Sequence, residues 1–365
     1  MNILENINNY IKNNCVYANK HKHNENIIVL NYSPRCIYEG VWDDITSICR
    51  GLIIDTSTGE ILARPFDKFF NYNEPGVMIP KGRPEVTVKL DGSLGISYCL
   101  DNKIYWATRG SFISEQSQAA QKMWDEKYSH VSVPKNLTLL TEIIHPTSRN
   151  VVKYDYEDLM LIGARDRFTG HDFNYFELST LSQELKLPIV EKVDFSDLNS
   201  VIDIAKSLDS QHEGFVLRWP DGYRVKVKSD QYLEAHRIIH GLSTQKIVNA
   251  WEFGKIEEII FALPEEFHSE VEKTKNDLDS LFEKEVNDFH YVVLAQISNF
   301  ASRKEYALWV QKDVPVHFQA AAFACYDGRS EKYLSILKKR ICTNYCKTDI
   351  CESEPTVDKV CAKSW

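Results

Sequence analysis

The sequence predicts an α+β fold in which a mixed α/β domain, residues 1–243, is followed by an all-helical domain, residues 244–342. In several short segments of the first part, apolar and polar residues alternate as they do in half-buried strands. From about Thr244 this alternation disappears, and apolar residues recur with helical spacing. A hydrophobic fraction of 43%, with only 12 prolines and 15 glycines, is typical of a folded protein.

Three segments of the first domain predict a strand meander: Glu85 to Leu90, Leu94 to Leu100 and Ile104 to Thr108. Asp91-Gly92 separates the first two, and we expect Asp91 to serve in forming a tight turn there. The alternation turns Lys89 away from the apolar side of its strand. Lysines before Asp-Gly turns are also common on solvated surfaces, so this segment alone assigns no function.

A further strand is predicted where the three cations of Arg224-Val225-Lys226-Val227-Lys228 share one face. Alternate residues of a strand lie about 6 to 7 Å apart, a spacing that suits a chain of phosphates. The alternative is the solvated face of an amphipathic strand.

Two glutamates adjoin strongly apolar runs. Glu142 lies within Leu137 to Ile144, and Glu213 precedes Gly214 to Leu217. An unpaired carboxylate would be costly to bury at either place, so both are candidates for a functional site. A glutamate on the outer face of a half-buried strand is the alternative.

The second domain predicts helices over residues 247–263, 265–295, 306–323 and 331–341, with breaks at Pro264 and Gly328. The stretch from Glu252 to Asp288 holds twelve acidic residues and four basic ones, which indicates a solvated helix face. No internal repeat is visible.

The chain also carries spaced sequence blocks in a fixed order. Lys89-Leu90-Asp91-Gly92-Ser93 is preceded by two blocks and followed by four. They are Cys49-Arg50-Gly51-Leu52, Arg64 to Asn71, Arg109-Gly110-Ser111, Leu139 to Ile144, Glu213 to Val216 and Lys226-Val227-Lys228-Ser229. This order resembles the covalent nucleotidyltransferase superfamily of polynucleotide ligases and mRNA capping enzymes. It is most similar to the RNA ligase 1 type of T-even bacteriophages, a tRNA-repair ligase, over roughly residues 30 to 235.

The resemblance implies a nucleotidyltransferase (ligase adenylation) domain with Lys89 as the nucleophile that carries AMP. It implies that Glu213 binds metal and favours deprotonation of the lysine, and that Lys226 and Lys228 stabilise charge on the phosphoryl oxygens. The implied nucleotide-binding residues are Arg50, Lys68, Phe70, Lys89, Gly92, Arg109, Glu142, Glu213, Lys226 and Lys228. Among these, Glu142 contacts the sugar, while Arg50 and Lys68 meet the outer phosphates. Arg109 stands where the phage enzyme has lysine, a change that conserves charge but alters contact geometry.

Two further positions match functional segments of the phage type, as RNA-contacting or active-site residues. Arg149 lies in the segment from Pro146 to Val152, where the usual asparagine is replaced by Ser148. Tyr232 matches a functional tyrosine, although a packing role on the first turn of a helix capped by Ser229 explains it equally well.

The activity implied is an ATP-dependent RNA ligase that joins 5′-phosphate and 3′-hydroxyl ends through lysyl-AMP and adenylylated RNA. The cofactors are ATP and Mg²⁺, with Mn²⁺ as an alternative metal. The implied substrate is RNA, including tRNA, in RNA repair. The helical second part favours this family over DNA ligases and capping enzymes, which typically continue into a β-barrel. A capping-type guanylyltransferase and a catalytically silent RNA-binding protein of the same fold are the alternatives.

The sequence has no G-x4-G-K-[ST] phosphate loop, so any end-healing kinase/phosphatase partner is expected to be a separate polypeptide. The net charge of −9 argues against broad coating of nucleic acid and for a basic groove confined to one surface. No apolar run is long enough to span a membrane, and the first residues lack the pattern of a signal peptide, so we expect a cytoplasmic protein without a membrane partner.

The nine cysteines fall into two groups. Cys15, Cys36, Cys49, Cys99 and Cys325 are scattered among apolar neighbours, as are free thiols in a reducing compartment. Cys342, Cys346, Cys351 and Cys361 cluster near the end, where residues 343–365 predict a polar tail. Without a tight C-x2-C pair, this cluster is either a four-thiolate zinc site or, as we favour, a set of free thiols.

Overall fold

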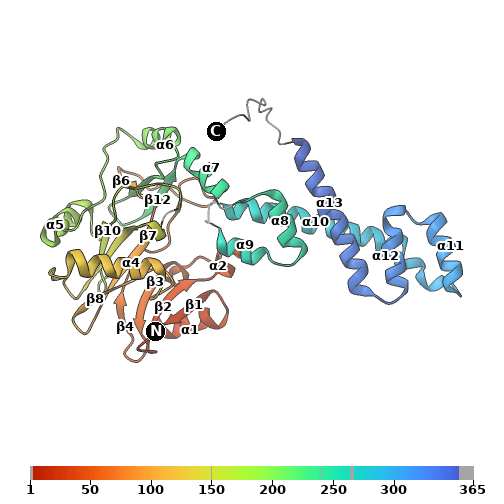
Figure 1. Cartoon of the computed structure of the whole chain (residues 1–365), viewed down its shortest axis with the longest axis horizontal. Helices are drawn as coiled ribbons and strands as arrows, with labels where there is room; N and C mark the ends of the chain where they lie inside the picture. The colour runs from red at the N-terminus through yellow and green to blue at the C-terminus, as the bar shows by residue number, and fades with distance from the viewer. Residues whose placement is uncertain (1–2, 149, 240, 264–266, 353–365) are drawn as a thin grey trace, which may run out of the picture. The chain divides into compact units, whose positions relative to one another are not determined.

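A computed structural model describes residues 3–148, 150–239, 241–263 and 267–352 of the chain (Figure 1). The structure divides into two compact units, residues 1–241 and 242–365. The first contains three four-stranded sheets, and the described part of the second is entirely helical, so the predicted α+β class is confirmed. No helix of the described residues has the length and apolar character needed to cross a membrane.

The strands of the first unit form three sheets. The first sheet is antiparallel, in the order β1 (Val16–Lys20), β2 (Ile27–Tyr32), β3 (Arg50–Asp55), β4 (Glu60–Ala63). The second has the order β10 (Asp158–Asp166), β9 (Leu137–Ile144), β7 (Ser93–Leu100), β8 (Lys103–Ala107). The third has the order β5 (Phe70–Asn71), β12 (Arg224–Lys228), β11 (Gly214–Arg218), β6 (Glu85–Lys89), with β5 parallel to β12.

Helices surround these sheets. They are α1 (Ile3–Lys12), α2 (Pro34–Tyr38), α3 (Asp44–Ile48), α4 (Glu115–Met123), α5 (Tyr175–Leu185), α6 (Leu198–Ser207) and α7 (Asp230–Ile239). A π-helical turn, Trp124–Tyr128, continues α4, and a 3-10 turn spans Pro146–Ser148. Several begin with the side-chain caps that favour helix initiation; Asp43, Asn174 and Asp197 form capping boxes.

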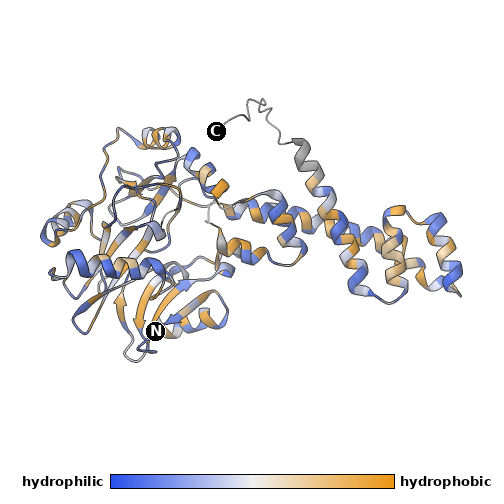
Figure 2. Ribbon diagram, viewed as in Figure 1, coloured by the Kyte–Doolittle hydropathy of each residue, from blue (hydrophilic) through white to orange (hydrophobic). Residues whose placement is uncertain are grey.

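Apolar side chains from facing strands form the core of the first unit. Ile53 of the first sheet and Ile96 and Leu140 of the second belong to one buried cluster, so these two sheets pack face to face. Figure 2 shows the apolar character of β2 and β3. In the third sheet the valines of β12, predicted to share a face, are buried against Val201 of α6. The opposite face therefore carries the lysines.

The predicted meander is only partly correct. Its three segments are strands, but β6 belongs to the third sheet and pairs with β11, whereas β7 and β8 pair with each other in the second. The chain thus crosses from one sheet to another at Asp91-Gly92 instead of folding back as a hairpin. A Cβ atom on Gly92 would lie 2.6 Å from the carbonyl oxygen of Ile143, so this crossing needs glycine against β9.

The second unit consists of α8 (Thr244–Glu252), α9 (Ile256–Ala262), α10 (His268–Val292), α11 (Arg303–Asp313), α12 (Val316–Tyr326) and α13 (Ser330–Glu352), with a 3-10 turn at Leu294–Asn299. Its core is aromatic: Phe289, Tyr306 and Phe318 are buried together with Leu337. The prediction that the last helix ends at residue 341 is wrong, because α13 continues to Glu352. No glycine or proline interrupts residues 330–352, so nothing in the sequence stops the helix earlier.

A substitution at Gly214 tests how closely β11 and β12 approach each other in the third sheet. Its φ is +137°, and a Cβ atom there would lie 2.0 Å from the carbonyl oxygen of Val227. We expect Gly214→Ala to lower the free energy of unfolding by about 2 kcal/mol or more, measured by chemical denaturation. Gly76→Ala is the matched control, because Gly76 also has a positive φ (+87°) but nothing within 4 Å. Equal losses in the two variants would contradict the close approach at Gly214.

Candidate active site

The register of the third sheet brings two predicted lysines to the same level. Gly214 of β11 pairs with Lys89 of β6 on one side and with Lys228 of β12 on the other. Because paired residues of adjacent strands point to the same face, both lysine side chains project from the sheet beside Gly214. Gly214 has no side chain, so the space between them is left to the preceding residue, Glu213.

Glu213 connects the two lysines. Its side chain is 4% exposed; Oε2 lies 2.9 Å from Nζ of Lys89, and Oε1 lies 2.8 Å from Nζ of Lys228. A carboxylate this deeply buried needs charged partners, and here each oxygen has one. Lys89 is the more accessible of the two lysines, with 20% of its side chain exposed against 8% for Lys228.

The predicted row of three cations on β12 is shortened by one. Lys226 lies two residues from Lys228 and therefore on the same face. Arg224, however, contacts the Asp172 carboxylate, with Nη1 2.6 Å from Oδ2 and Nη2 3.0 Å from Oδ1. Arg218 also donates to Asp172. The prediction that Arg224 belongs to a phosphate-binding row is therefore wrong, because a buried bidentate ion pair uses its guanidinium.

Asp91 lies where the chain crosses from one sheet to another, so the prediction that it forms a tight hairpin turn is also wrong. The residue is 2% exposed, and its carboxylate accepts hydrogen bonds from the backbone N–H groups of Val151 (2.8 Å) and Val152 (2.7 Å). Asn150 donates to it from Nδ2 at 2.9 Å, and the Tyr232 hydroxyl donates at 2.9 Å. The carboxylate thus fastens the segment after Lys89 to the loop 150–152 and to α7.

Tyr232 has the packing role that the sequence allowed. Its side chain is 1% exposed, and its backbone N–H donates to Oγ of Ser229, which precedes α7. The ring also lies 5.5 Å from Nζ of Lys228.

Ser148 is buried in the 3-10 turn Pro146–Ser148, and its hydroxyl makes no hydrogen bond. The prediction for Arg149 falls outside the described residues.

Glu142 lies on β9 beside the crossing at Gly92. A Cβ atom on Gly92 would be 3.0 Å from Cγ of Glu142. The pKa of Glu142 is raised to about 7, mainly by burial; Lys89 opposes the shift, and the nearby carboxylates of Glu213 and Asp91 add to it. Glu142, Glu213 and Asp91 therefore act electrostatically on one another around Lys89.

Cations and aromatic rings form a second group. Lys68 is 9% exposed, with Nζ 4.4 Å from the Phe70 ring and 5.3 Å from the Trp42 ring. The Arg50 guanidinium lies 5.5 Å from the Phe69 ring, and its Nη1 is buried without a hydrogen-bond acceptor. A buried donor in this state is a candidate for an anionic ligand.

Two contacts join this group to the rest of the site. Phe70 pairs with Val225 on β12, which places it next to the strand that carries Lys226 and Lys228. Arg109 donates from Nη1 to the Tyr32 hydroxyl at 3.1 Å, and the Tyr32 ring packs edge-on against Trp42. The structure thus brings Phe70 to the lysine strand and connects Arg109 to Lys68 through two aromatic rings.

Sequence reasoning missed several residues of this region. Trp42 and Asp172 stand in loops without a periodic pattern, so no local signal marks them. The amide of Asn150 and the hydroxyl of Tyr154, which accepts from the backbone N–H of Asp91 at 2.9 Å, become relevant only through tertiary contacts.

The cysteines of the described part of the chain whose side chains are placed are free thiols: Cys15, Cys36, Cys49, Cys99, Cys325, Cys342 and Cys346. Within residues 3–352, excluding the gaps, no group of three or more histidine, cysteine, aspartate and glutamate side chains could hold a metal ion. The suggested zinc site also requires the Cys351 side chain and Cys361, which lie outside the part that is described.

Comparison with curated proteins finds RNA ligases. The chain is 24% identical over 400 aligned positions to the RNA ligase of Rhodothermus phage RM378, covering 87% of this chain and 89% of that protein. It is 26% identical to a putative RNA ligase of Thermovibrio ammonificans, and the alignment covers 58% of this chain and 59% of that protein. The chain therefore spans about three fifths of that relative. It is 28% identical to a putative bifunctional polynucleotide kinase/RNA ligase of Autographa californica nuclear polyhedrosis virus, covering 58% and 33%.

Among solved structures, Naegleria gruberi RNA ligase with PPi is 24% identical, with a TM-score of 0.35 over 42% of this chain and 52% of that one. A mutant of the same ligase with ATP and Mn is 23% identical, also with a TM-score of 0.35. A family model described as RNA ligase, of the T4 RNA ligase 1 type, matches residues 48–232, which include Lys89, Glu213 and both lysines of β12. The chain therefore belongs to the RNA ligase family of the T4 RNA ligase 1 type.

Proposed function

We propose that this protein is an ATP-dependent RNA ligase that joins RNA 5′-phosphate and 3′-hydroxyl ends through a lysyl-AMP and an adenylylated RNA intermediate. The observation that carries the proposal is the buried Glu213 carboxylate held between Lys89 and Lys228. It fixes a partly exposed amine at the end of a strand, next to a second cation, where a nucleotide phosphate can be attacked.

In the first step Lys89 attacks the α-phosphate of ATP. The Nζ–P bond forms, the bond between the α-phosphorus and the bridging oxygen breaks, and pyrophosphate leaves with the electron pair. Lysine must first lose a proton, and Oε2 of Glu213, 2.9 Å from Nζ, is positioned to accept it. Lys228 on the other oxygen and Lys226 beside it favour the negative charge that develops on the phosphoryl oxygens.

Arg50 and Lys68 fit the leaving pyrophosphate. The buried Nη1 of Arg50 has no acceptor, and a phosphate oxygen would supply one. Phe70 and Trp42 hold the Lys68 ammonium in place from two sides. Arg109, connected through Tyr32, is assigned to a phosphate of the RNA.

A magnesium or manganese ion fits the carboxylates of this site, because hard divalent cations take one or two carboxylates together with substrate phosphates. Both oxygens of Glu213 are paired with ammonium groups, so a cation reaches Glu213 only in place of one of them. A cation nearby would favour the charged form of Glu142, whose pKa is raised mainly by burial, and we assign Glu142 itself to the nucleotide sugar. When bound, the metal would neutralise charge on the phosphates.

In the second step the RNA 5′-phosphate oxygen attacks the phosphorus of lysyl-AMP, and the Lys89 amine leaves. In the third a 3′-hydroxyl attacks the RNA 5′-phosphorus, losing its proton as AMP leaves and a phosphodiester forms. The same cations serve each step, because charge develops on phosphoryl oxygens every time. We further propose a role in RNA repair, with tRNA as a substrate.

The bifunctional viral relative supports a link to end healing, because its name joins a polynucleotide kinase to an RNA ligase. The present sequence contains no G-x4-G-K-[ST] loop. We therefore propose that a separate kinase/phosphatase polypeptide heals the ends.

Lys89→Ala should abolish covalent labelling of the protein by α-labelled ATP, because no other amine occupies its position. Sealing of RNA that is already adenylylated should persist. Lys89→Arg is the control for charge, since it can keep the ion pair with Glu213 but is a poor nucleophile, and it too should take no label. Labelling by GTP instead of ATP would identify a capping-type enzyme. No label from either, in folded protein free of bound AMP, would favour a silent RNA-binding protein.

Arg50→Ala should slow formation of lysyl-AMP by about 100-fold, since it removes a donor to the departing phosphates. Sealing of pre-adenylylated RNA, in which those phosphates are absent, should change little. Rates of label incorporation and of sealing, measured separately, test this division. An equal loss in both reactions would contradict the assignment of Arg50 to pyrophosphate.

Glu142→Gln should stabilise the ligand-free protein in a pH-dependent way. Between the ordinary pKa of 4.5 and about 7, the folded wild type keeps a proton that the unfolded chain has lost, so its stability falls as pH rises. Glutamine does not titrate. The stability gain of the variant should therefore grow from pH 4.5 to 7 and then level off, at up to about 3 kcal/mol. Urea denaturation at pH 5 and pH 8 measures it, and an equal difference at both would refute the shift.

A further inference from the structure

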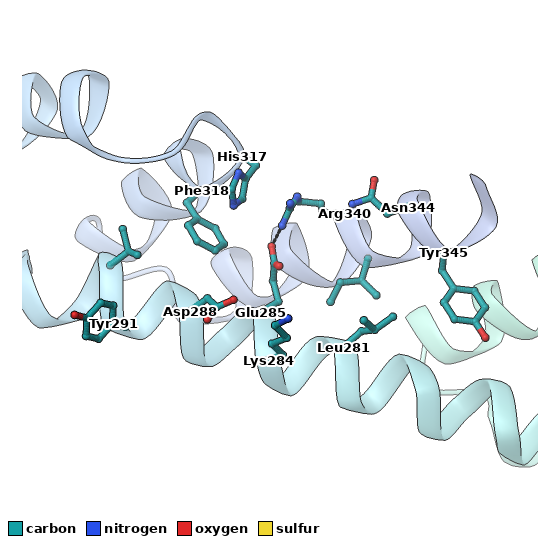
Figure 3. A pocket seen from close by; sticks show the side chains of 12 residues that line it. Leu281, Lys284, Glu285, Asp288, Tyr291, His317, Phe318, Arg340, Asn344 and Tyr345 are labelled. Carbon is teal, nitrogen blue, oxygen red and sulfur yellow. Dashed lines mark ion pairs between the residues drawn. The ribbon is translucent and has the colours of Figure 1, made fainter. Parts of the chain in front are cut away.

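The helical unit contains a pocket of about 720 Å³ between α10, α12 and α13, within the size range of sites that bind small organic groups. Figure 3 shows the ion pair between Glu285 of α10 and Arg340 of α13 near its middle, with His317 and Phe318 of α12 beside it. No step of the proposed ligation uses this pocket.

One end of the pocket is aromatic. Phe318 is 3% exposed, and its ring contacts the His317 ring at a centroid distance of 4.2 Å. Tyr291, which also lines the pocket, is 84% exposed. A flat ring entering here would meet the exposed rings of Tyr291 and His317, and such rings stack with bases in RNA-binding proteins.

The charges that line the pocket cancel. The positive charges of Arg340 and Lys284 are balanced by the negative charges of Glu285 and Asp288. Arg340 already forms an ion pair with Glu285. An isolated phosphate would therefore gain little, whereas an uncharged group with hydrogen-bonding edges matches a lining that contains both donors and acceptors. Lys339, which precedes Arg340 on α13, is exposed and does not line the pocket, so it could contact a phosphate outside it.

We propose that this pocket holds a single unstacked base of the RNA substrate, with the backbone on the α13 side. The acidic excess of α10 is compatible with this arrangement, because only the base contacts that helix. The inference rests on the proposed function for the identity of the substrate, and it adds a subsite that selects RNA by an extruded base.

The test is the affinity of the full chain for a short single-stranded RNA, measured by fluorescence anisotropy without ATP. Tyr291→Ala combined with His317→Ala removes two exposed rings and leaves the buried core intact. Affinity should fall roughly 10-fold or more, from stacking worth about 1–3 kcal/mol per base. Phe253→Ala is the matched control, since Phe253 is an aromatic residue of the same unit that is 71% exposed and does not line the pocket.

RNA containing 5-bromouridine should also crosslink under ultraviolet light to the peptide carrying Tyr291 or His317. Unchanged affinity in the double variant, with no crosslink in these peptides, would overturn the proposal and leave the pocket to another class of ligand, such as a peptide. Labelling by α-labelled ATP is followed in the same samples. If the wild-type protein takes no label and the double variant still binds RNA more weakly than the wild type, the ligase mechanism is rejected. The proposal that the pocket binds a base is then supported independently of it.

Discussion

A buried carboxylate between two ammonium groups is the constraint on which the catalytic site depends. Taken alone, Glu213 would be strongly disfavoured at 4% exposure, and Lys228 at 8% would be disfavoured for the same reason. Their opposite charges compensate each other, and Lys89, on strand β6 at the other side of β11, pairs with the second oxygen of Glu213. Because Gly214 pairs with both lysines, the backbone of β11 determines the distance between them. Removing Glu213 would leave two ammonium groups without a carboxylate, whereas removing either lysine would still leave an ion pair with the other.

Asp91 supplies the second constraint. It follows Lys89 by two residues, at the point where the chain passes from the third sheet to the second. Its carboxylate accepts hydrogen bonds from two backbone N–H groups, an amide and a phenol, so the loop 150–152 and α7 both attach to one buried group. The position of the Lys89 amine relative to Glu142 therefore depends on a carboxylate that has no direct contact with a substrate phosphate in this mechanism.

Local patterns in the sequence were sufficient to predict most strands and helices and to identify the candidate lysines. The alternation in β6 and β12 gave both strands and the face that carries Lys89, Lys226 and Lys228, because a period of two is a property of the backbone. Sheet membership was not predictable in the same way. Whether β6 pairs with β7 or with β11 depends on contacts more than a hundred residues apart, and Asp91-Gly92 is compatible with both a hairpin and a crossing. Arg224 shows the same limit, since its partner Asp172 lies 52 residues away in a loop without periodicity.

The distribution of cations is compatible with the proposed binding of a polyanion by a chain with a net charge of −9. Asp172 and Glu85 together neutralise Arg224 and Arg218 at one end of β12, so positive potential is concentrated toward Lys226 and Lys228. Arg50 adds a donor whose desolvation is not compensated within the described part of the protein. An unsatisfied buried donor costs about 1–3 kcal/mol, and an arriving phosphate recovers that cost. Under the proposed function, nucleotide binding would therefore stabilise the fold by the same contacts that position the nucleotide for attack.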